Sequence, residues 1–330
     1  MDGDLRVGRA GATQPPGTVE LNHVEAETPA PSRPTDSQTP LAAAAARDAR
    51  RRIELRDAEF PLPRRARVIA VANQKGGVGK TTSTVNIAAA LAQRGAQVLV
   101  IDIDPQGNAS TALGASHQSG TPSIYHVVLG QARARDVIVP CSTIPGLWCL
   151  PATIDLSGAE IELVGLESRE SRLARALSGL SSDWIAQGAR RFDYVFIDCP
   201  PSLGLLTVNA LVAAREVLIP IQCEYYALEG LSQLLSNIEL VRSRLNGDLR
   251  VSTILMTMFD GRTNLSGDVV REVRGHFPNL VLHALVPRSV RVAEAPGYGE
   301  TVLTYDAAST GALAYLEAAH EIARRGAEGN

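Results

Sequence analysis

Apolar runs and helical patterns alternate along the chain from about residue 66 onward. The apolar runs predict strands at residues 68–73, 98–103, 147–150, 194–197, 217–221, 252–258 and 281–285. The patterns between them predict helices at residues 81–93, 169–180, 205–213, 227–245, 265–276 and 311–327. This alternation is typical of a doubly wound α/β fold, a mostly parallel sheet with helices on both faces. Ligands of such folds lie beyond the carboxyl ends of the strands, so functional residues are expected there.

The first 65 residues lack this alternation. Residues 1–40 are rich in Pro, Thr, Ala and Gly and poor in large apolar side chains, which predicts a disordered tail. The Ala- and Arg-rich run that follows, LAAAAARDARRRIELR, favours a helix, and Pro61 and Pro63 separate it from the next segment. We therefore expect a disordered tail (1–40), a basic helical or linker segment (41–65) and one α/β domain (66–330).

A glycine-rich loop joins the first strand of this domain to its first helix. Its sequence is Gln74-Lys75-Gly76-Gly77-Val78-Gly79-Lys80-Thr81-Thr82. In a strand–loop–helix unit the loop N–H groups and the positive end of the helix dipole converge on phosphate oxygens. The spacing predicts a P-loop NTPase fold in which Lys80 reaches the β- and γ-phosphates and the Thr81 hydroxyl binds Mg²⁺. Gln74 replaces the first glycine of the usual pattern, and Lys75 stands at the mouth of the loop.

Lysine occurs nowhere else in the chain. Of the 32 Lys and Arg residues, only Lys75 and Lys80 are lysines. A compact ammonium on a flexible stem fits among phosphates where a planar guanidinium does not. Both positions are therefore interpreted as sites that need lysine specifically.

Carboxylates follow two other predicted strands. Asp102 and Asp104 end the strand at 98–103, and alternation would point both toward phosphate and metal. Either could orient an attacking water, or merely cap the following turn. Asp198 ends the strand at 194–197, as in a Walker-B arrangement in which the carboxylate holds Mg²⁺. Pro200, Pro201 and Gly204 follow it and suit a switch that senses the γ-phosphate.

Composition narrows the class of protein. The net charge is −3, although residues 41–67 carry eight arginines against four acids, so DNA affinity would depend on local arginine patches. The four cysteines form no C-x-x-C pair, which is typical of buried thiols in a reducing cytoplasm. The acidic N-terminus resembles no signal peptide, and no apolar run is long enough to span a bilayer. We expect a soluble, cytoplasmic protein.

Five motifs together resemble the ParA/Soj family of chromosome- and plasmid-partitioning ATPases, relatives of MinD with a deviant Walker A loop. They are KGGVGKTT, DIDPQGNAS, DCPPSLGLLTVNAL, QCEYYALEG and VPRSVRVAEAPGYGE, and the resemblance covers about residues 66–325. It implies ATP and Mg²⁺ as cofactors, with Thr81, Asp104 and Asp198 at the metal. It implies catalytic roles for Lys80, for Asp104 as the water-activating residue and for Lys75, which reaches the partner's phosphates in an ATP-sandwiched homodimer. Nucleotide contacts are implied for residues 75–82, for Asn209 at adenine and for Pro287 near the same base.

The same resemblance implies partners. The family binds double-stranded DNA non-specifically as an ATP-bound dimer on the nucleoid, and a centromere-binding ParB partner stimulates its slow hydrolysis. Arg262 and Arg291 resemble positions that contact DNA, with Arg288 and Arg271 as weaker candidates. For each arginine the alternative is a solvated surface charge or an ion pair within the chain.

Three alternatives stay open at this point. A MinD-like membrane-cycling ATPase would need a C-terminal amphipathic helix, whereas this C-terminus is Ala-rich and carries acids. An iron–sulfur carrier would need paired thiolates, which the scattered cysteines do not supply. The arginines of residues 47–56 could contact DNA or a polar scaffold protein, or form a solvated helix.

Overall fold

The computed structural model describes residues 40–186 and 188–328 of the chain. Apart from Pro40, the predicted disordered tail lies outside these described residues. The chain divides into two units after Ala45. The larger unit, residues 46–330, contains the sheet and all of the predicted site residues.

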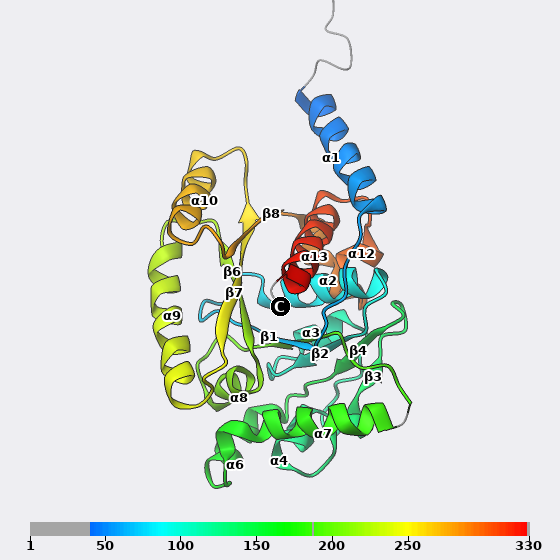
Figure 1. Ribbon diagram of the computed structural model, residues 1–330, viewed down its shortest axis with the longest axis vertical. Helices are drawn as coiled ribbons and strands as arrows, with labels where there is room; N and C mark the ends of the chain where they lie inside the picture. Colours follow the sequence, from blue (N-terminus) through cyan, green and yellow to red (C-terminus); the bar gives the residue numbers. More distant parts are fainter. Residues whose placement is uncertain (1–39, 187, 329–330) are drawn as a thin grey trace, which may run out of the picture. The chain divides into compact units, whose positions relative to one another are not determined.

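One eight-stranded sheet forms the centre of the larger unit (Figure 1). Its strands lie in the order β3-β4-β2-β5-β1-β6-β7-β8, and every neighbouring pair is parallel except β3 and β4. Their bounds are β1 (Arg67–Val71), β2 (Val98–Asp102), β3 (Val139–Pro140), β4 (Leu147–Leu150), β5 (Tyr194–Asp198), β6 (Glu216–Gln222), β7 (Arg250–Phe259) and β8 (Val281–Pro287). The predicted α/β fold with a mostly parallel sheet is confirmed. The apolar pattern does not predict β3, because this strand has only two residues and both are exposed.

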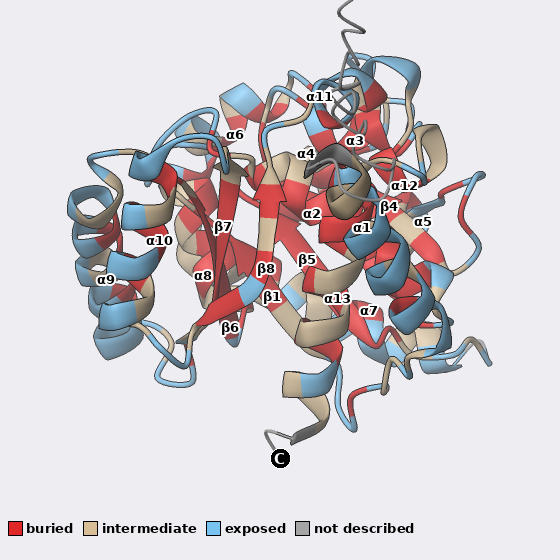
Figure 2. Cartoon of the chain, turned by 90° about the horizontal axis from the view of Figure 1, so that it is seen from above, coloured by how far each residue is buried: buried red, intermediate tan, exposed pale blue. Residues whose placement is uncertain are grey.

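Helices cover both faces of the sheet, each over its own apolar core. Figure 1 shows α2 (Lys80–Gln93) and α13 (Thr310–Glu328) on one side of the strands, and α7 (Arg172–Ala186) and α8 (Leu205–Ala213) on the other. Also on the second side are α9 (Ala227–Arg244) and α10 (Asn264–His276). Ile69 and Val71 of β1 enter the core beneath α2, whereas Ala70 enters the opposite one, as the two-residue period of a strand requires. The buried residues in Figure 2 accordingly gather on the strands.

Short helices fill the connections. They are α3 (Asn108–Ala112), α4 (Ile124–Leu129), α5 (Ala134–Val137), α6 (Leu156–Val164), α11 (Val290–Glu294) and α12 (Val302–Tyr305), with 3₁₀ turns η2 (Arg169–Ser171) and η3 (Ala295–Tyr298). Apart from η2, which lies within the helix predicted at residues 169–180, the sequence pattern does not predict them, because most span less than two turns and so cannot display a 3.6-residue period. None of the described helices is both long and apolar enough to cross a membrane.

The basic segment forms helix α1 (Pro40–Asp57), whose residues from Ala46 onward belong to the larger unit. Arg51 pairs with Glu317 on α13. The Arg52 guanidinium donates hydrogen bonds to the three main-chain carbonyls that precede α13, those of Ala307, Ala308 and Ser309, at 2.9, 2.5 and 2.8 Å. Arg94 at the end of α2 donates to two main-chain carbonyls at the end of α1, at 2.9 and 3.1 Å. This part of the segment is therefore docked, and two of its arginines face the domain.

The strand register brings the predicted site elements to one edge of the sheet. Val71 of β1 and Asp102 of β2 both pair with Asp198 of β5, so the three strands end level with one another. The glycine-rich loop leaves β1 at this edge, and both acidic motifs leave their strands at the same edge. One carboxyl edge of the sheet therefore gathers all three predicted elements.

Candidate active site

The glycine-rich loop is held in shape by its neighbours. Gly77 and Gly79 adopt left-handed conformations with φ of 76° and 88°, which a residue with a side chain rarely tolerates. The Thr257 hydroxyl of β7 donates a hydrogen bond to the Val78 carbonyl at 2.8 Å. The Asn73 side-chain amide donates a hydrogen bond to the Pro220 carbonyl of β6 at 2.7 Å. Its oxygen accepts a hydrogen bond from the Lys75 N–H at 3.0 Å. These contacts within the protein hold the loop in its turns.

Lys80 lies inside this loop. It is the first residue of α2 and is only 7% exposed, and its ammonium donates to the carbonyl of Lys75 at 3.2 Å. Burial lowers the pKa of Lys80, while the carboxylates of Asp198 and Asp104 oppose this shift. A buried cation with one neutral acceptor is poised for an anion, as the predicted phosphate contact requires.

Two of the three predicted metal ligands, Thr81 and Asp198, are in direct contact, and Thr84 joins them. The Thr81 hydroxyl donates to Asp198 Oδ2 at 2.7 Å, and the Thr84 hydroxyl donates to Oδ1 at 3.1 Å. Asp198 is fully buried, and burial raises its pKa to about 8, with the charge of Asp102 adding to the shift and both hydroxyls opposing it. A hydroxyl and a carboxylate are hard oxygen donors of the kind that Mg²⁺ binds alongside substrate phosphates. The donor set therefore fits this ion.

The two carboxylates after β2 have different surroundings. Asp102 accepts hydrogen bonds from the Ser110 N–H at 2.8 Å and the Ser110 hydroxyl at 2.7 Å, and it also accepts from the Asp104 N–H at 3.2 Å. Burial raises the pKa of Asp102 to about 6. Asp102 therefore holds α3 to the end of β2, the structural role that its position before a turn allows, and its orientation toward phosphate and metal stays a prediction. Asp104 accepts one local bond, from the Gln106 N–H at 3.0 Å, and is the more available carboxylate.

Lys75 has surroundings opposite to those of Lys80. Its side chain is 53% exposed and pairs with the carboxylate of Glu224, which follows β6. The two lysines of one loop thus differ: Lys80 is enclosed and Lys75 is accessible from outside the protomer. Glu224 lies in the quoted motif QCEYYALEG, but nothing in the sequence pattern connects it with Lys75.

The side chain of Asn209 is buried, unlike that of a residue that lines an open ligand site. It is fully buried in α8, donates to the carbonyls of Arg169 at 2.7 Å and Leu205 at 3.0 Å, and accepts from the Leu173 N–H at 3.2 Å. In this arrangement its amide joins α8 to η2 and α7. Pro287 ends β8 and is half-buried. The adenine contacts of both residues stay predictions.

The predicted DNA-contact arginines are exposed, but most are paired with acids. Arg262 is 87% exposed and binds Asp260 through two hydrogen bonds of 2.8 and 2.7 Å, which lower the pKa of Asp260 to about 2. Arg291 lies 3.2 Å from Glu294 and 3.6 Å from Asp306, and Arg271 pairs with Asp268. Arg288 is exposed, directly after β8. DNA phosphates would compete with these acids for the first three arginines.

Thr84 and Thr257, like Glu224, were not predicted from the sequence. Thr84 binds Asp198 from one helical turn beyond Thr81, and Thr257 anchors the loop from β7. The spacing of three residues between Thr81 and Thr84 on one helix face is a signal that could have indicated the first. Thr257 gives no such signal, because it is distant in sequence and meets the loop only through the sheet order.

Known proteins match this chain over nearly the whole α/β domain. A family model described as "AAA domain" matches residues 66–251. The sporulation initiation inhibitor protein Soj of Bacillus subtilis is 49% identical over 260 residues, which are 79% of this chain and 99% of Soj. This chain belongs to the ParA/Soj family of chromosome-partitioning ATPases. The chromosome partitioning protein ParA of Myxococcus xanthus is a further member, 48% identical over 78% of this chain and 88% of that protein.

Solved structures agree with the fold of this ParA/Soj family member. A Mycobacterium smegmatis structure named cobyrinic acid a,c-diamide synthase, with bound ATP analogue and magnesium, is 40% identical over 79% of this chain and 96% of that chain, with a TM-score of 0.67. The cell division ATPase MinD of Pyrococcus furiosus has a TM-score of 0.63 over 78% of this chain and 98% of MinD. At 24% identity, that likeness concerns the P-loop NTPase fold alone.

Proposed function

We propose that this partitioning ATPase is a DNA-bound switch controlled by ATP. ATP and Mg²⁺ close a homodimer, the dimer binds double-stranded DNA without sequence preference, and hydrolysis releases it. The observation that carries the proposal is the division between the two lysines: Lys80 is buried beneath its own loop, whereas Lys75 is exposed at the mouth. An exposed lysine in a phosphate loop can reach the nucleotide that is bound to the partner protomer.

The residues of one protomer would bind the nucleotide as follows. The loop N–H groups of residues 76–82 and the Lys80 ammonium hold the phosphates. Thr81 and Asp198 hold Mg²⁺, which when bound supplies positive charge to the phosphate oxygens. Because the Asp198 carboxyl loses its proton when a cation binds, the raised pKa makes this step pH-dependent.

Asp104 and Lys75 would supply the catalytic groups. Asp104 positions a water molecule and accepts its proton, which is supported by its free carboxylate oxygen at the same sheet edge as Lys80. Lys75 leaves Glu224 and neutralises the charge that develops on the partner's phosphates. Hydrolysis is slow in a protomer without its dimer partner, since one charge of the site is missing. A ParB-type protein stimulates turnover, and a polar scaffold protein is a possible additional partner.

DNA binding would belong to the dimer. Arg262 and Arg291, with Arg288 and Arg271, supply exposed guanidinium groups on the loop after β7, on α10 and on the segment after β8. When ATP closes two protomers into a dimer, the number of contacts with DNA phosphates doubles. DNA affinity is therefore coupled to ATP binding. The protein would thus be associated with the nucleoid in the cytoplasm, where it drives partition of a chromosome or plasmid.

The switch is tested by DNA binding measured with ADP, ATP and a non-hydrolysable ATP analogue on wild type and on Lys75→Ala. We expect tight binding by wild type with ATP or the analogue only. Lys75→Ala should bind nucleotide, but it should hydrolyse ATP, and therefore release DNA, more slowly than wild type. DNA binding that is independent of the nucleotide would overturn the switch.

The structure gives little support to the two alternative functions, a MinD-like membrane cycle and an iron–sulfur carrier. A MinD-like membrane cycle needs a free amphipathic helix, but α13 buries its apolar face against the domain, with Leu313, Tyr315 and Ile322 at most 1% exposed. Liposome co-sedimentation with ATP tests this point. An iron–sulfur carrier needs accessible thiolates, whereas all four cysteines are buried and burial raises the pKa of Cys199 and Cys223.

A further inference from the structure

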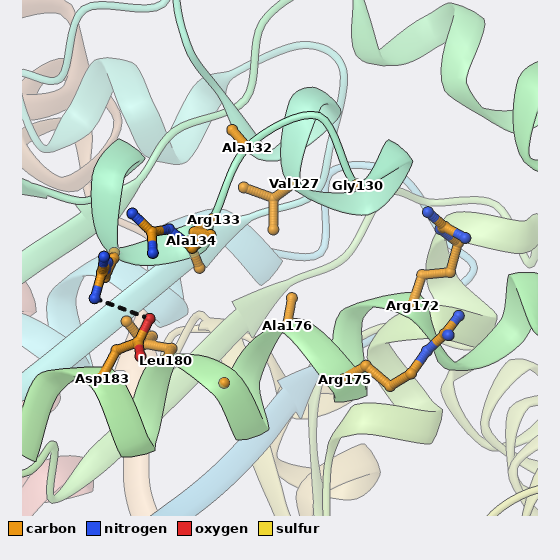
Figure 3. Close-up of a pocket in the computed structure, with 12 residues that line it drawn as sticks. Val127, Gly130, Ala132, Arg133, Ala134, Arg172, Arg175, Ala176, Leu180 and Asp183 are labelled. Atoms are coloured by element: carbon orange, nitrogen blue, oxygen red, sulfur yellow. Dashed lines mark ion pairs between the residues drawn. The ribbon is translucent and has the colours of Figure 1, made fainter.

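A pocket of about 350 Å³ lies between α4, α5 and α7, and it shares no residue with the phosphate loop, the metal position or the DNA-contact arginines. Its lining carries four arginines, Arg133, Arg135, Arg172 and Arg175, against one acid, Asp183. Figure 3 shows Arg172 and Arg175 together at one end and Arg133 at the other, with Val127 and Ala176 between them. We call this pocket the arginine groove.

The two ends of the arginine groove differ in charge balance. At one end Arg135 pairs with Asp183 at 3.2 Å, and Arg133 pairs with Asp136 at 2.9 Å. At the other end Arg172 and Arg175 hydrogen-bond only to main-chain carbonyls among the described residues. Two neighbouring guanidinium groups without a carboxylate repel each other, so this end favours an anion.

Arg172 is held in place by the main chain at the end of α4. Its guanidinium donates to the carbonyls of Val128 and, at 2.9 Å, Leu129 at the end of α4. Gly130 follows with φ of 79°, and a Cβ there would lie 2.8 Å from the Arg172 guanidinium. A fixed guanidinium with unused N–H groups loses little entropy when it binds an anion. Gly130 and the α4 carbonyls therefore preorganise this end of the groove.

The floor between the two ends is apolar and made of small or aliphatic residues, Val127, Ala132, Ala134, Ala176 and Leu180. A single small anion would contact only the Arg172 end and leave this floor in water. A peptide can place a carboxylate on Arg172 and Arg175 and, at the same time, an aliphatic side chain on the floor. We propose that the arginine groove binds an acidic, aliphatic-containing segment of a partner protein.

The test begins with selection of peptides from a displayed random library on the full-length protein. The selected consensus peptide is then titrated by fluorescence anisotropy. We expect Asp or Glu next to Leu, Ile or Val in the consensus, and at least tenfold weaker binding to Arg175→Glu. Arg175 is the variant of choice because it is exposed and makes only two bonds of 3.4 Å, so its loss leaves the fold intact.

The control is Arg244→Glu, the same charge change at an exposed arginine of α9. It should bind the peptide as wild type does. No acidic consensus, or equal affinity for Arg175→Glu and wild type, overturns the proposal. Displacement of the peptide by inorganic phosphate at lower concentration than by free glutamate also overturns it, since the groove would then be a phosphate site. Neither readout depends on ATP hydrolysis, so the result is independent of the proposed switch.

Discussion

Within one nine-residue loop, Lys75 and Lys80 have opposite surroundings although they carry the same charge. Lys80 is enclosed at the first residue of α2, and Lys75 extends from the mouth of the loop to Glu224. Their chemistry follows from this placement, because an enclosed ammonium binds the nucleotide of its own protomer and an exposed one is accessible to another. Single substitutions should therefore separate the two functions.

We expect Lys80→Ala to abolish ATP binding, because the loop loses the cation that faces the phosphates. Lys75→Ala is the matched control from the same loop, and it should bind ATP with an affinity close to that of wild type. The measurement is a titration with a fluorescent ATP analogue. ATP binding by Lys80→Ala at wild-type affinity would contradict the assignment of this loop.

Asp104→Ala should bind ATP and dimerise but lose about 10²- to 10⁴-fold in hydrolysis rate, since the water molecule loses its base. The dimer should then stay on DNA. Asp102→Ala is the comparison: it should mainly lower thermal stability, because α3 loses its bonds to β2. Steady-state ATPase and thermal unfolding assays distinguish the two. Normal hydrolysis by Asp104→Ala would remove this residue from the mechanism.

At the scale of elements, a buried ion pair ties β1 to β6. Arg67 lies 2.7 Å from Glu216, with 11% and 5% of the two side chains exposed, and Arg67 also donates to an α13 carbonyl at 2.6 Å. Burial alone would raise the pKa of Glu216, but the hydrogen bonds and charge of Arg67 outweigh burial and hold the pKa below its usual value. The pair therefore stabilises the fold while Glu216 is ionised.

Glu216→Gln should lower the free energy of unfolding by about 3 kcal/mol at pH 7, because Arg67 is left buried without its counter-charge. The difference from wild type should be complete above the unfolded-state pKa near 4.5. It should shrink as the pH falls through the lower folded-state pKa. Urea unfolding between pH 7 and pH 3 measures it, with Glu239→Gln in an exposed pair as control. A difference that does not change with pH would contradict the linkage.

The docked part of α1 gives a second prediction at this scale. Arg52→Ala should cost about 1–2 kcal/mol of stability, because three hydrogen bonds from a charged group to the start of α13 are lost. Arg50→Ala, an exposed position on the same helix, should change stability by less than about 0.5 kcal/mol. Thermal unfolding compares the two. Equal effects would show that α1 does not brace the domain.

At the scale of the whole molecule, the dimer and its DNA determine the behaviour. With Arg262 and Arg291 in each protomer, four phosphate contacts per dimer predict a slope of about −3.6 for log affinity against log salt. Arg262→Ala should reduce this slope to about −1.8, and Arg244→Ala on α9 should leave it unchanged. The titration is done with a non-hydrolysable ATP analogue. A wild-type slope near zero would contradict electrostatic DNA binding.

Local patterns in the sequence determined most of the fold and the centre of the site. Buried strands are continuous apolar runs, long helices repeat every 3.6 residues, and the phosphate loop lies within nine consecutive residues, so each can be recognised without knowledge of distant contacts. β3 and most of the short helices were not predicted, because a segment of a few residues cannot display a period. The family resemblance supplied the roles of Lys75 and Asp104, which the residue pattern alone left open.

Only the tertiary structure decided how residues distant in sequence share their surroundings. The sheet order brings Thr257 to the loop and Glu224 to Lys75, and the register places Asp102 and Asp198 side by side. Packing assigned Asp102 to α3, turned Arg51 and Arg52 toward α13 and gathered four arginines around one groove. The physical reason is that charge pairing, burial and the pKa of a group depend on neighbours that the chain supplies from anywhere along its length.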